Sequence, residues 1–347
     1  MSGGGPPPRM SVIVPVRNDA GSLAQCLAAL TTARPPDTEI IVVDDASTDA
    51  SAAVAARFPV RLVRLARQGG PAAARNHGAG QAAGDVLMFV DSDVVVAPGA
   101  LRQAAALLDA RPDVAAVFGS YDARPAAPGL VSRYRNLLHH FVHQEGAAEA
   151  STFWAGCGAV QRRAFEEVGG FDPGRFPRPS IEDIELGLRL CRAGHRIRLE
   201  RTLQATHLKR WTFRSMLWTD IAGRAVPWSR LALEHGALPD DLNLRRDQRW
   251  SAALVGLATV GLAGSAIEPR LAAASVAALA GVIWLNRRLY RFFAAHGGVP
   301  FAGACAALHW LYYLYGGLAF VGVWAATRLR GTWSRASGAI RGGLRRA

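Results

Sequence analysis

The sequence predicts an α/β protein with a mostly parallel, Rossmann-like sheet, followed by a helical C-terminal region. Three observations lead to this prediction. Apolar runs of strand length alternate with helical patterns over residues 10–118. The run Val86–Val90 lacks polar alternation, as expected of a strand that is covered on both faces. Long uncharged runs lie beyond residue 250.

The first third of the chain reads as strands and helices in alternation. The predicted strands are residues 11–16, 39–45, 60–65, 86–90 and 114–118. The predicted helices between them are residues 21–32, 47–57, 71–83 and 99–110. Ser47, Thr48 and Asp49 supply capping residues for the second of these helices. Strands that alternate with helices of this length favour a parallel sheet with right-handed crossovers.

Two carboxylates, Asp91 and Asp93, follow the apolar run directly. In open α/β sheets, ligands lie just beyond the carboxyl ends of the strands. Two hard oxygen ligands at that place can hold a divalent cation against a diphosphate. The alternative for so short a motif is a surface turn rich in Asp. A dinucleotide cofactor is not expected, because no G-x-G-x-x-G motif opens the first helix.

The composition narrows the possible partners and compartment. The formal charge of +13 comes from 40 Lys and Arg against 27 Asp and Glu, which suits nucleic acid or an anionic membrane face. The cysteines lie far apart without a C-x-x-C pair, which argues against a disulfide framework or a structural zinc site. They are Cys26, Cys157, Cys191 and Cys305. Residues 1–9 are rich in Gly and Pro and are predicted to be a disordered tail.

Four motifs occur in a fixed order along the chain. They are Val14-Pro15-Val16-Arg17-Asn18, Val42-Val43-Asp44-Asp45 with Ala46-Ser47-Thr48-Asp49, Gly70-Pro71-Ala72-Ala73-Ala74-Arg75-Asn76-His77-Gly78, and Asp91-Ser92-Asp93. Together they resemble family 2 glycosyltransferases with the GT-A fold, over residues 10–210. The resemblance implies an inverting transferase that uses a nucleotide-activated sugar and a Mg²⁺ or Mn²⁺ ion.

The resemblance also implies which residues bind the donor. They are Pro15, Asn18, Asp44, Asp45, Arg75, Asn76 and Asp91, with Asp91 and Asp93 as metal ligands. The family places an acid such as Asp44 or Asp45 on the base, whereas a charge at a helix N-terminus is the alternative for Asp45. Arg75 can neutralise phosphate and Asn76 can bond a neighbouring loop. The alternative for Arg75 is an ordinary solvated side chain.

The acceptor side is expected over residues 151–190. Residues 151–159, with Gly156, look like the family's segment beneath the acceptor site, where small residues let a sugar approach the backbone. Glu182-Asp183 resembles the family's acidic pair, whose Asp is the catalytic base. Glu182 is placed with the substrate-binding residues. The helical pattern of residues 180–190 puts Glu182, Asp183, Glu185 and Arg189 on the surface and predicts an i, i+4 pair between the last two.

His207 lies where several relatives supply a third metal or diphosphate contact. A single His is more often structural, which is the alternative here.

Beyond residue 210 the chain changes character. Residues 211–250 interleave Trp and Phe with Arg, which suits stacking on nucleic acid or helices lying in a membrane interface. Uncharged runs of 17, 15 and 27 residues follow at 251–267, 271–285 and 301–327. A span needs roughly 20 apolar residues, so residues 251–327 are predicted to be embedded in a membrane, and no nucleic acid is expected. Residues 328–347 form a basic tail.

Two topologies are compatible with the positive charges. The loop Arg287–Arg291 and the basic tail both favour the cytoplasmic side, yet one crossing by residues 301–327 would separate them. Either Gly316-Gly317 marks a re-entrant turn or the tail faces outward. The catalytic domain is expected in the cytoplasm, where nucleotide sugars are, on a multi-pass inner-membrane protein.

The sequence therefore favours a membrane-bound glycosyltransferase that acts on a lipid-linked or glycan acceptor. The alternative is a non-catalytic nucleotide-sugar-binding subunit of a membrane assembly. Loss of the acidic residues would favour that alternative, but Asp45, Asp91, Asp93 and Asp183 are all present.

Overall fold

The computed structural model describes residues 8–235 and 245–343, with side chains described as far as Leu329. The disordered tail predicted for residues 1–9 lies outside the described residues, except for Pro8 and Arg9. The chain divides into two compact units, residues 1–213 with 241–243, and residues 214–240 with 244–347. All four cysteines of the sequence lie in the described residues, and each is a free thiol.

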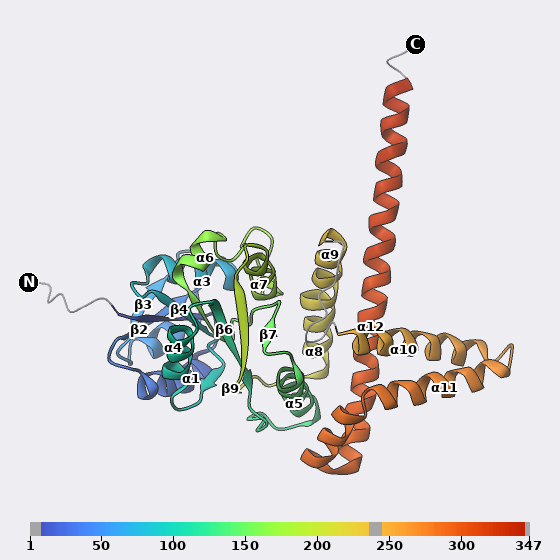
Figure 1. The fold of residues 1–347 in the computed structure, drawn as a ribbon, viewed down its shortest axis with the longest axis horizontal. Coiled ribbons are helices and arrows are strands. Elements are labelled where there is room, and N and C mark those ends of the chain that lie inside the picture. The colour runs from blue at the N-terminus through green and yellow to red at the C-terminus, as the bar shows by residue number, and fades with distance from the viewer. Residues whose placement is uncertain (1–7, 236–244, 344–347) are drawn as a thin grey trace, which may run out of the picture. The chain divides into compact units, whose positions relative to one another are not determined.

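One sheet of nine strands forms the described core of the first unit (Figure 1). The strands are β1 (Met10–Val16), β2 (Thr38–Asp44), β3 (Arg61–Arg64), β4 (Val86–Val90), β5 (Val94–Val96), β6 (Val114–Tyr121), β7 (Glu149–Ala150), β8 (Cys157–Gln161) and β9 (Arg196–His207). Their order is β3-β2-β1-β4-β8-β6-β9-β5, and β7 pairs with β9. Strands β1 to β4, β6 and β9 point one way, whereas β5, β7 and β8 run opposite. The predicted α/β class with a mostly parallel sheet is confirmed.

Helices cover both faces of this sheet because neighbouring residues of a strand point to opposite faces. In β1, Val12 and Val14 pack in one apolar cluster and Ile13 in the other. The first cluster includes residues of α1 (Ala20–Ala33), α2 (Ser51–Ala55) and α4 (Ala100–Ala110). The second includes residues of α3 (Gly70–Gln81), α6 (Arg162–Glu167) and α7 (Glu182–Arg192). The remaining helix of this unit, α5 (Leu130–Glu145), lies against β6.

The sheet brings several chain segments to one edge. The last residues of β1 and β2, Val16 and Asp44, are register partners. The last residue of β4, Val90, pairs with Cys157, so the segment before β8 enters at the same edge. Strand β8 is antiparallel to its neighbours β4 and β6. A sheet built only of parallel crossovers would contain no such strand. Strand β8 therefore places residues 154–156 beside Asp91 and Asp93, the two carboxylates predicted to bind the metal, hereafter the metal-side carboxylates.

The second unit is helical in its described part. Its helices are α8 (Phe213–Asp220), the π-helical turn η1 (Ile221–Ala225), α9 (Val226–His235), α10 (Arg246–Gly264), α11 (Arg270–Leu285) and α12 (Arg287–Gly343). The Tyr313 hydroxyl of α12 lies 2.7 Å from Gln248 Oε1 and 2.9 Å from Asn286 Oδ1. Asn286 Nδ2 donates to Ser251 Oγ at 3.0 Å. These buried polar contacts tie α10, α11 and α12 together.

One local prediction for this unit was wrong. The expected loop Arg287–Arg291 is the first part of α12, and Asn286 alone separates it from α11. Of the two topologies left open, the one with a turn at Gly316-Gly317 is not supported, because both residues are helical. The non-helical residue in α12 is Gly298, with φ 79°, followed closely by Pro300. A positive φ is accessible to Gly, and Pro lacks the N–H that would continue the hydrogen-bond ladder.

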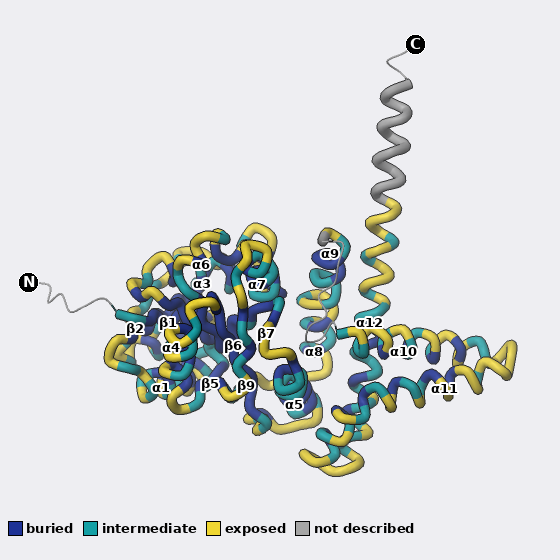
Figure 2. The backbone as a smooth tube through the Cα atoms, in the orientation of Figure 1, coloured by how far each residue is buried: buried dark blue, intermediate teal, exposed yellow. Residues whose placement is uncertain are grey.

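One helical stretch in the described residues, Arg287–Leu329, is long and apolar enough to cross a membrane. The apolar helix α11 has 16 residues and falls short of that length. Large apolar residues are nevertheless exposed on α10 and α11 as well. They include Val260, Val276 and Ile283. Figure 2 marks exposed residues in yellow along both helices. The sequence predicted several membrane spans. Among the described residues, one helix is a candidate span.

Candidate active site

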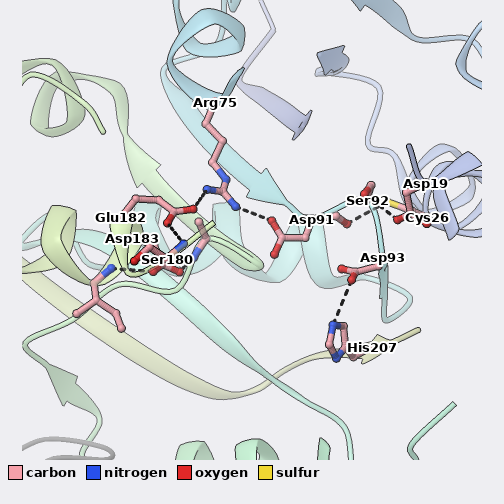
Figure 3. A network of polar contacts seen from close by, with 12 residues as sticks. Asp19, Cys26, Arg75, Asp91, Ser92, Asp93, Ser180, Glu182, Asp183 and His207 are labelled. Atoms are coloured by element: carbon pink, nitrogen blue, oxygen red, sulfur yellow. Dashed lines mark hydrogen bonds and ion pairs between the residues drawn. The ribbon is translucent and has the colours of Figure 1, made fainter. Parts of the chain in front are cut away.

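Asp91, Asp93 and His207 lie together at the end of β4 (Figure 3). The Asp91 and Asp93 side chains are 33% and 23% exposed, so both carboxylates remain accessible. His207, the last residue of β9, lies with Nε2 3.4 Å from Asp93 Oδ2. Burial alone would raise the pKa of Asp93, but the hydrogen bond and charge of His207, with Lys209, lower it. Asp93 is therefore held as a carboxylate at neutral pH.

The donor groups at this place suit a Mg²⁺ or Mn²⁺ ion. Two partly exposed carboxylates are hard oxygen ligands, and such ions are commonly held by one or two carboxylates together with substrate phosphates. No group of three or more His, Cys, Asp or Glu residues that could hold a metal by itself occurs in the ranges that the structure covers. Asp91 and Asp93 therefore fit a shared site, in which a diphosphate would complete the ligands.

Arg75 connects the two halves of the site. Its Nη2 donates to Asp91 Oδ1 at 2.7 Å and its Nη1 donates to Glu182 Oε1 at 2.9 Å. The guanidinium also lies over the Phe171 ring, 5.4 Å from the centroid. Since the Arg75 side chain is only 6% exposed, the alternative of an ordinary solvated arginine is wrong. Arg75 instead places the acidic pair at the start of α7 beside the carboxylates that follow β4.

Asp183 occupies a site that suits a general base. Its Oδ2 accepts a hydrogen bond from Ala155 N–H at 3.1 Å, and its Oδ1 accepts one from Ile184 N–H at 2.8 Å. Burial raises the pKa of this carboxyl, and the Glu182 charge raises it further, whereas the Arg75 charge lowers it, with a net pKa of about 7. A group with a pKa near the working pH is the most effective base.

The expectation that the acids of α7 lie on the surface was wrong for two of them. Glu182 and Glu185 are 5% and 6% exposed. Each is buried because a positive partner compensates its charge. Glu182 binds Arg75, while Glu185 forms the predicted i, i+4 pair with Arg189, with both N–O distances at 2.8 Å. Glu182 Oε2 also accepts a hydrogen bond from Ser180 N–H at 2.8 Å.

Asp44 and Asp45 are buried and already bound to protein groups. Asp44 Oδ1 accepts from Ser47 N–H at 2.9 Å, and its Oδ2 lies 3.3 Å from Arg64 Nε. Asp45 accepts hydrogen bonds from Gly69 N–H at 2.6 Å and Gly70 N–H at 2.9 Å. The Asp45 carboxylate thus joins the end of β2 to the start of α3. A contact of either acid with a nucleotide base stays a prediction.

The remaining donor-side residues shape the same edge. Pro15 lies in β1 opposite Val43, one residue before the strand ends. Asn18 adopts a left-handed conformation, with φ 53°, which Asn tolerates better than most residues. Its Oδ1 accepts from Thr48 N–H at 2.8 Å, which ties the loops after β1 and β2 together.

Asn76 bonds a neighbouring loop, as the sequence suggested it could. Its Nδ2 donates to Phe171 O at 2.8 Å and its Oδ1 accepts from Phe171 N–H at 2.9 Å. This pair fixes the loop whose Phe171 ring underlies Arg75.

The segment Trp154–Gly156 touches both halves of the site. Ala155 N–H binds Asp183, and Gly156 O accepts a hydrogen bond from Asp91 N–H at 3.3 Å. A Cβ on Gly156 would lie 2.6 Å from the Trp154 ring, so any other residue would force that ring to move. Sequence reasoning did not single out Trp154 or Tyr121, whose rings pack edge to face at 4.8 Å. No local pattern marks this pair, because its members come from segments more than thirty residues apart.

Residues 11–169 match the family described as "Glycosyl transferase family 2". This family 2 region contains Asp45, Arg75, Asp91, Asp93 and Gly156, and it ends before α7. The pre-mycofactocin glycosyltransferase of Mycobacterium tuberculosis is 31% identical over 242 residues, which are 65% of this chain and 48% of that protein. The chain therefore spans about half the length of that curated relative.

Solved structures share the fold of the family 2 region. The mannosyltransferase PcManGT from Pyrobaculum calidifontis, in complex with GDP-Man and Mn²⁺, has a TM-score of 0.59 and 21% identity over 91% of this chain and 87% of that chain. S. aureus TarS 1-349, in complex with UDP-GlcNAc, has a TM-score of 0.52 and 17% identity over 92% of each chain. At these identities the likeness concerns the fold alone.

Proposed function

We propose that the chain is a membrane-bound inverting glycosyltransferase, which moves a sugar from a nucleotide-sugar donor to a hydroxyl or phosphate of a lipid-linked or cell-envelope glycan acceptor. One observation carries this proposal. The carboxyl group of Asp183 has a pKa of about 7 and follows Glu182 in α7. Arg75 pairs with both Glu182 and Asp91, and so links Asp183 to the accessible carboxylates Asp91 and Asp93. A base and a diphosphate-compatible metal site at one sheet edge suit the transfer of a group from a diphosphate.

The comparisons support a nucleoside diphosphate sugar as the donor. PcManGT was solved with GDP-Man and Mn²⁺, and TarS 1-349 with UDP-GlcNAc. Both donors carry a sugar on a diphosphate, so the shared fold is compatible with that class. The similarity to a pre-mycofactocin glycosyltransferase supports the same kind of reaction. The intact acidic set argues against the non-catalytic subunit considered from the sequence.

The proposed reaction is a single displacement at the anomeric carbon. Asp183 accepts the proton of the acceptor hydroxyl, and the acceptor oxygen forms a bond to the anomeric carbon of the donor. The bond between that carbon and the diphosphate breaks, and the nucleoside diphosphate leaves with the bonding electrons. Asp91 and Asp93 would hold a divalent cation whose charge offsets that of the departing diphosphate, with His207 orienting Asp93. Arg75 keeps Asp91 and Glu182 in place.

A panel of nucleotide sugars offered to membranes that contain the full chain tests the proposed function. We expect one donor to be consumed, with release of its nucleoside diphosphate and a product whose mass exceeds that of the acceptor by one sugar residue. Mass spectrometry of the extracted product identifies both sugar and acceptor. Donor binding without any product, across acceptors present in the native membranes, would favour the non-catalytic subunit instead.

The second unit is proposed to attach the enzyme to the inner membrane, with the catalytic domain of residues 10–210 in the cytoplasm. Arg287–Leu329 supplies a candidate span. Residues 211–250 are proposed to lie in the membrane interface, although 236–244 lie outside the described residues. Trp218 is 71% exposed and Arg214 is exposed four residues before it, as an interfacial helix requires. Residues 251–285 are proposed to be embedded as a hairpin, which would make the protein multi-pass, and residues 328–347 are proposed to be a basic tail.

We expect the full chain to sediment with membranes and to require detergent for extraction. A truncated chain that ends at Arg249 lacks the candidate span and should be released more easily, because it keeps only the Trp-rich interfacial residues. The measurement is the fraction in the pellet after washing with high salt or with carbonate. Release of the full chain by either wash alone would show that the apolar helices form a soluble bundle.

A further inference from the structure

The ring of Tyr121, the last residue of β6, joins side chains from three other segments. It stacks on the His207 imidazole, with centroids 4.3 Å apart and planes within 8°. It contacts the His139 ring of α5 at 4.2 Å and the Trp154 ring at 4.8 Å. Tyr121 is only 7% exposed, and the proposed reaction gives it no role. The buried Tyr121 ring is therefore the shared contact of these three rings, next to the metal-side carboxylates.

His207 needs a support of this kind. The backbone after it is fixed, because Leu208 N–H donates to Asp93 O at 2.8 Å and His207 pairs with Val94 of β5. These bonds leave the imidazole free to rotate about its side-chain torsions. Stacking on a rigid aromatic ring restricts that rotation and keeps Nε2 near Asp93 Oδ2, at 3.4 Å. The direction of the Asp93 carboxylate thus depends on the ring that stacks on its imidazole partner.

Helix α5 fixes Tyr121 in turn. His140 Nδ1 lies 2.7 Å from Tyr121 O, and His143 Nδ1 lies 2.9 Å from Gly119 O, so two histidines of α5 anchor the end of β6. The third, His139, packs against the Tyr121 ring and the His143 ring in tilted contacts. Desolvation lowers the pKa of His139 well below its ordinary value, so its ring stays neutral and packs as an aromatic group.

We propose that Tyr121 is a positioning residue, whose ring holds the His207 imidazole against Asp93 and so sets the geometry of the divalent-cation site. The inference rests on the proposed function, because it assigns the cation and the nucleoside diphosphate to Asp91 and Asp93. It adds a residue that neither the motifs nor the family 2 resemblance singled out. Removing a group that orients a metal ligand without binding the metal itself commonly weakens metal affinity by about 10- to 100-fold.

The experiment measures binding of GDP and of UDP to the full chain in detergent by calorimetry, at increasing Mn²⁺ concentration. Tyr121→Leu and Tyr121→Met, which remove the ring, should raise the Mn²⁺ concentration for half-maximal nucleotide binding by about tenfold. Tyr121→Phe keeps the ring and should stay within about twofold of wild type. In a His207→Ala background, adding Tyr121→Leu should change this concentration by less than about twofold, because the two residues act as one unit.

Phe118→Leu is the matched control for lost packing. Phe118 lies on the same strand, is fully buried, and packs on Phe153 and His143 rather than on His207. It should lower thermal stability without changing the Mn²⁺ dependence. Equal effects of Phe118→Leu and Tyr121→Leu, or additive effects of Tyr121→Leu and His207→Ala, would overturn the positioning role. If wild type binds no nucleoside diphosphate in a Mn²⁺-dependent manner, including that of the donor which the panel of nucleotide sugars identifies, the proposed cation site fails, and this assignment fails with it.

Discussion

Asp183→Asn is expected to cut sugar transfer by about 10²- to 10⁴-fold, the usual contribution of a positioned base, while donor affinity stays near wild type. Asn keeps the size of the side chain and an oxygen that can accept the Ala155 N–H bond, but it cannot take up a proton. Donor binding needs the metal-side carboxylates, whereas only transfer needs a base. The measurement is the initial transfer rate beside donor affinity by calorimetry, in the same detergent.

The pH dependence of the reaction provides the control for this assignment. With a pKa of about 7, Asp183 is a carboxylate above that pH and becomes protonated below it, so kcat/KM should fall as the pH drops through about 7. Glu182→Gln removes a charge that raises this pKa, so the fall should move to lower pH. A near-wild-type rate for Asp183→Asn would show that another group is the base, whereas lost donor binding would place Asp183 in the nucleotide site.

Asp93→Asn is expected to abolish turnover and cation-dependent donor binding, with the fold retained. The substitution removes one of two accessible carboxylates at the end of β4, together with the negative partner of His207. Calorimetry of the donor with and without Mg²⁺ or Mn²⁺ measures the effect, and thermal melting reports the fold.

Asp85→Asn is the matched control for Asp93→Asn. Asp85 is exposed and immediately precedes the same strand at its opposite end, so the same chemical change there should leave donor binding intact. Donor affinity that is equal with and without the cation in wild type would contradict the metal-site assignment.

Most of the fold could be predicted because its signals are local. The run Val86–Val90 is apolar throughout since both faces of β4 are covered, and its burial is complete. Strand β9 was missed because arginines occupy its exposed positions, although Ile197 and Leu199 alternate as a half-buried strand requires. The reversed direction of β8 has no local signal, because pairing between distant strands sets it.

In the candidate site too, residues with a local signal could be predicted, whereas contacts between distant residues could not. Asp91 and Asp93 could be chosen because they follow an apolar strand, and Asp183 because it lies in an acidic pair that resembles a known motif. The pairing of Arg75 with Glu182 joins residues 107 positions apart, so no spacing rule predicts it. Tyr121 was missed for the same reason, since its partners become neighbours only through the sheet and α5.

The configuration of the newly formed glycosidic bond tests the central claim most directly. A single displacement, in which Asp183 deprotonates the acceptor and the acceptor attacks opposite the diphosphate, inverts the anomeric carbon. Proton NMR of the purified product, made with the donor that the panel identifies, gives that configuration from the coupling constant of the anomeric proton. We predict a configuration opposite to that of the nucleotide sugar. A product with the donor's own configuration would contradict direct attack by a hydroxyl that Asp183 has deprotonated.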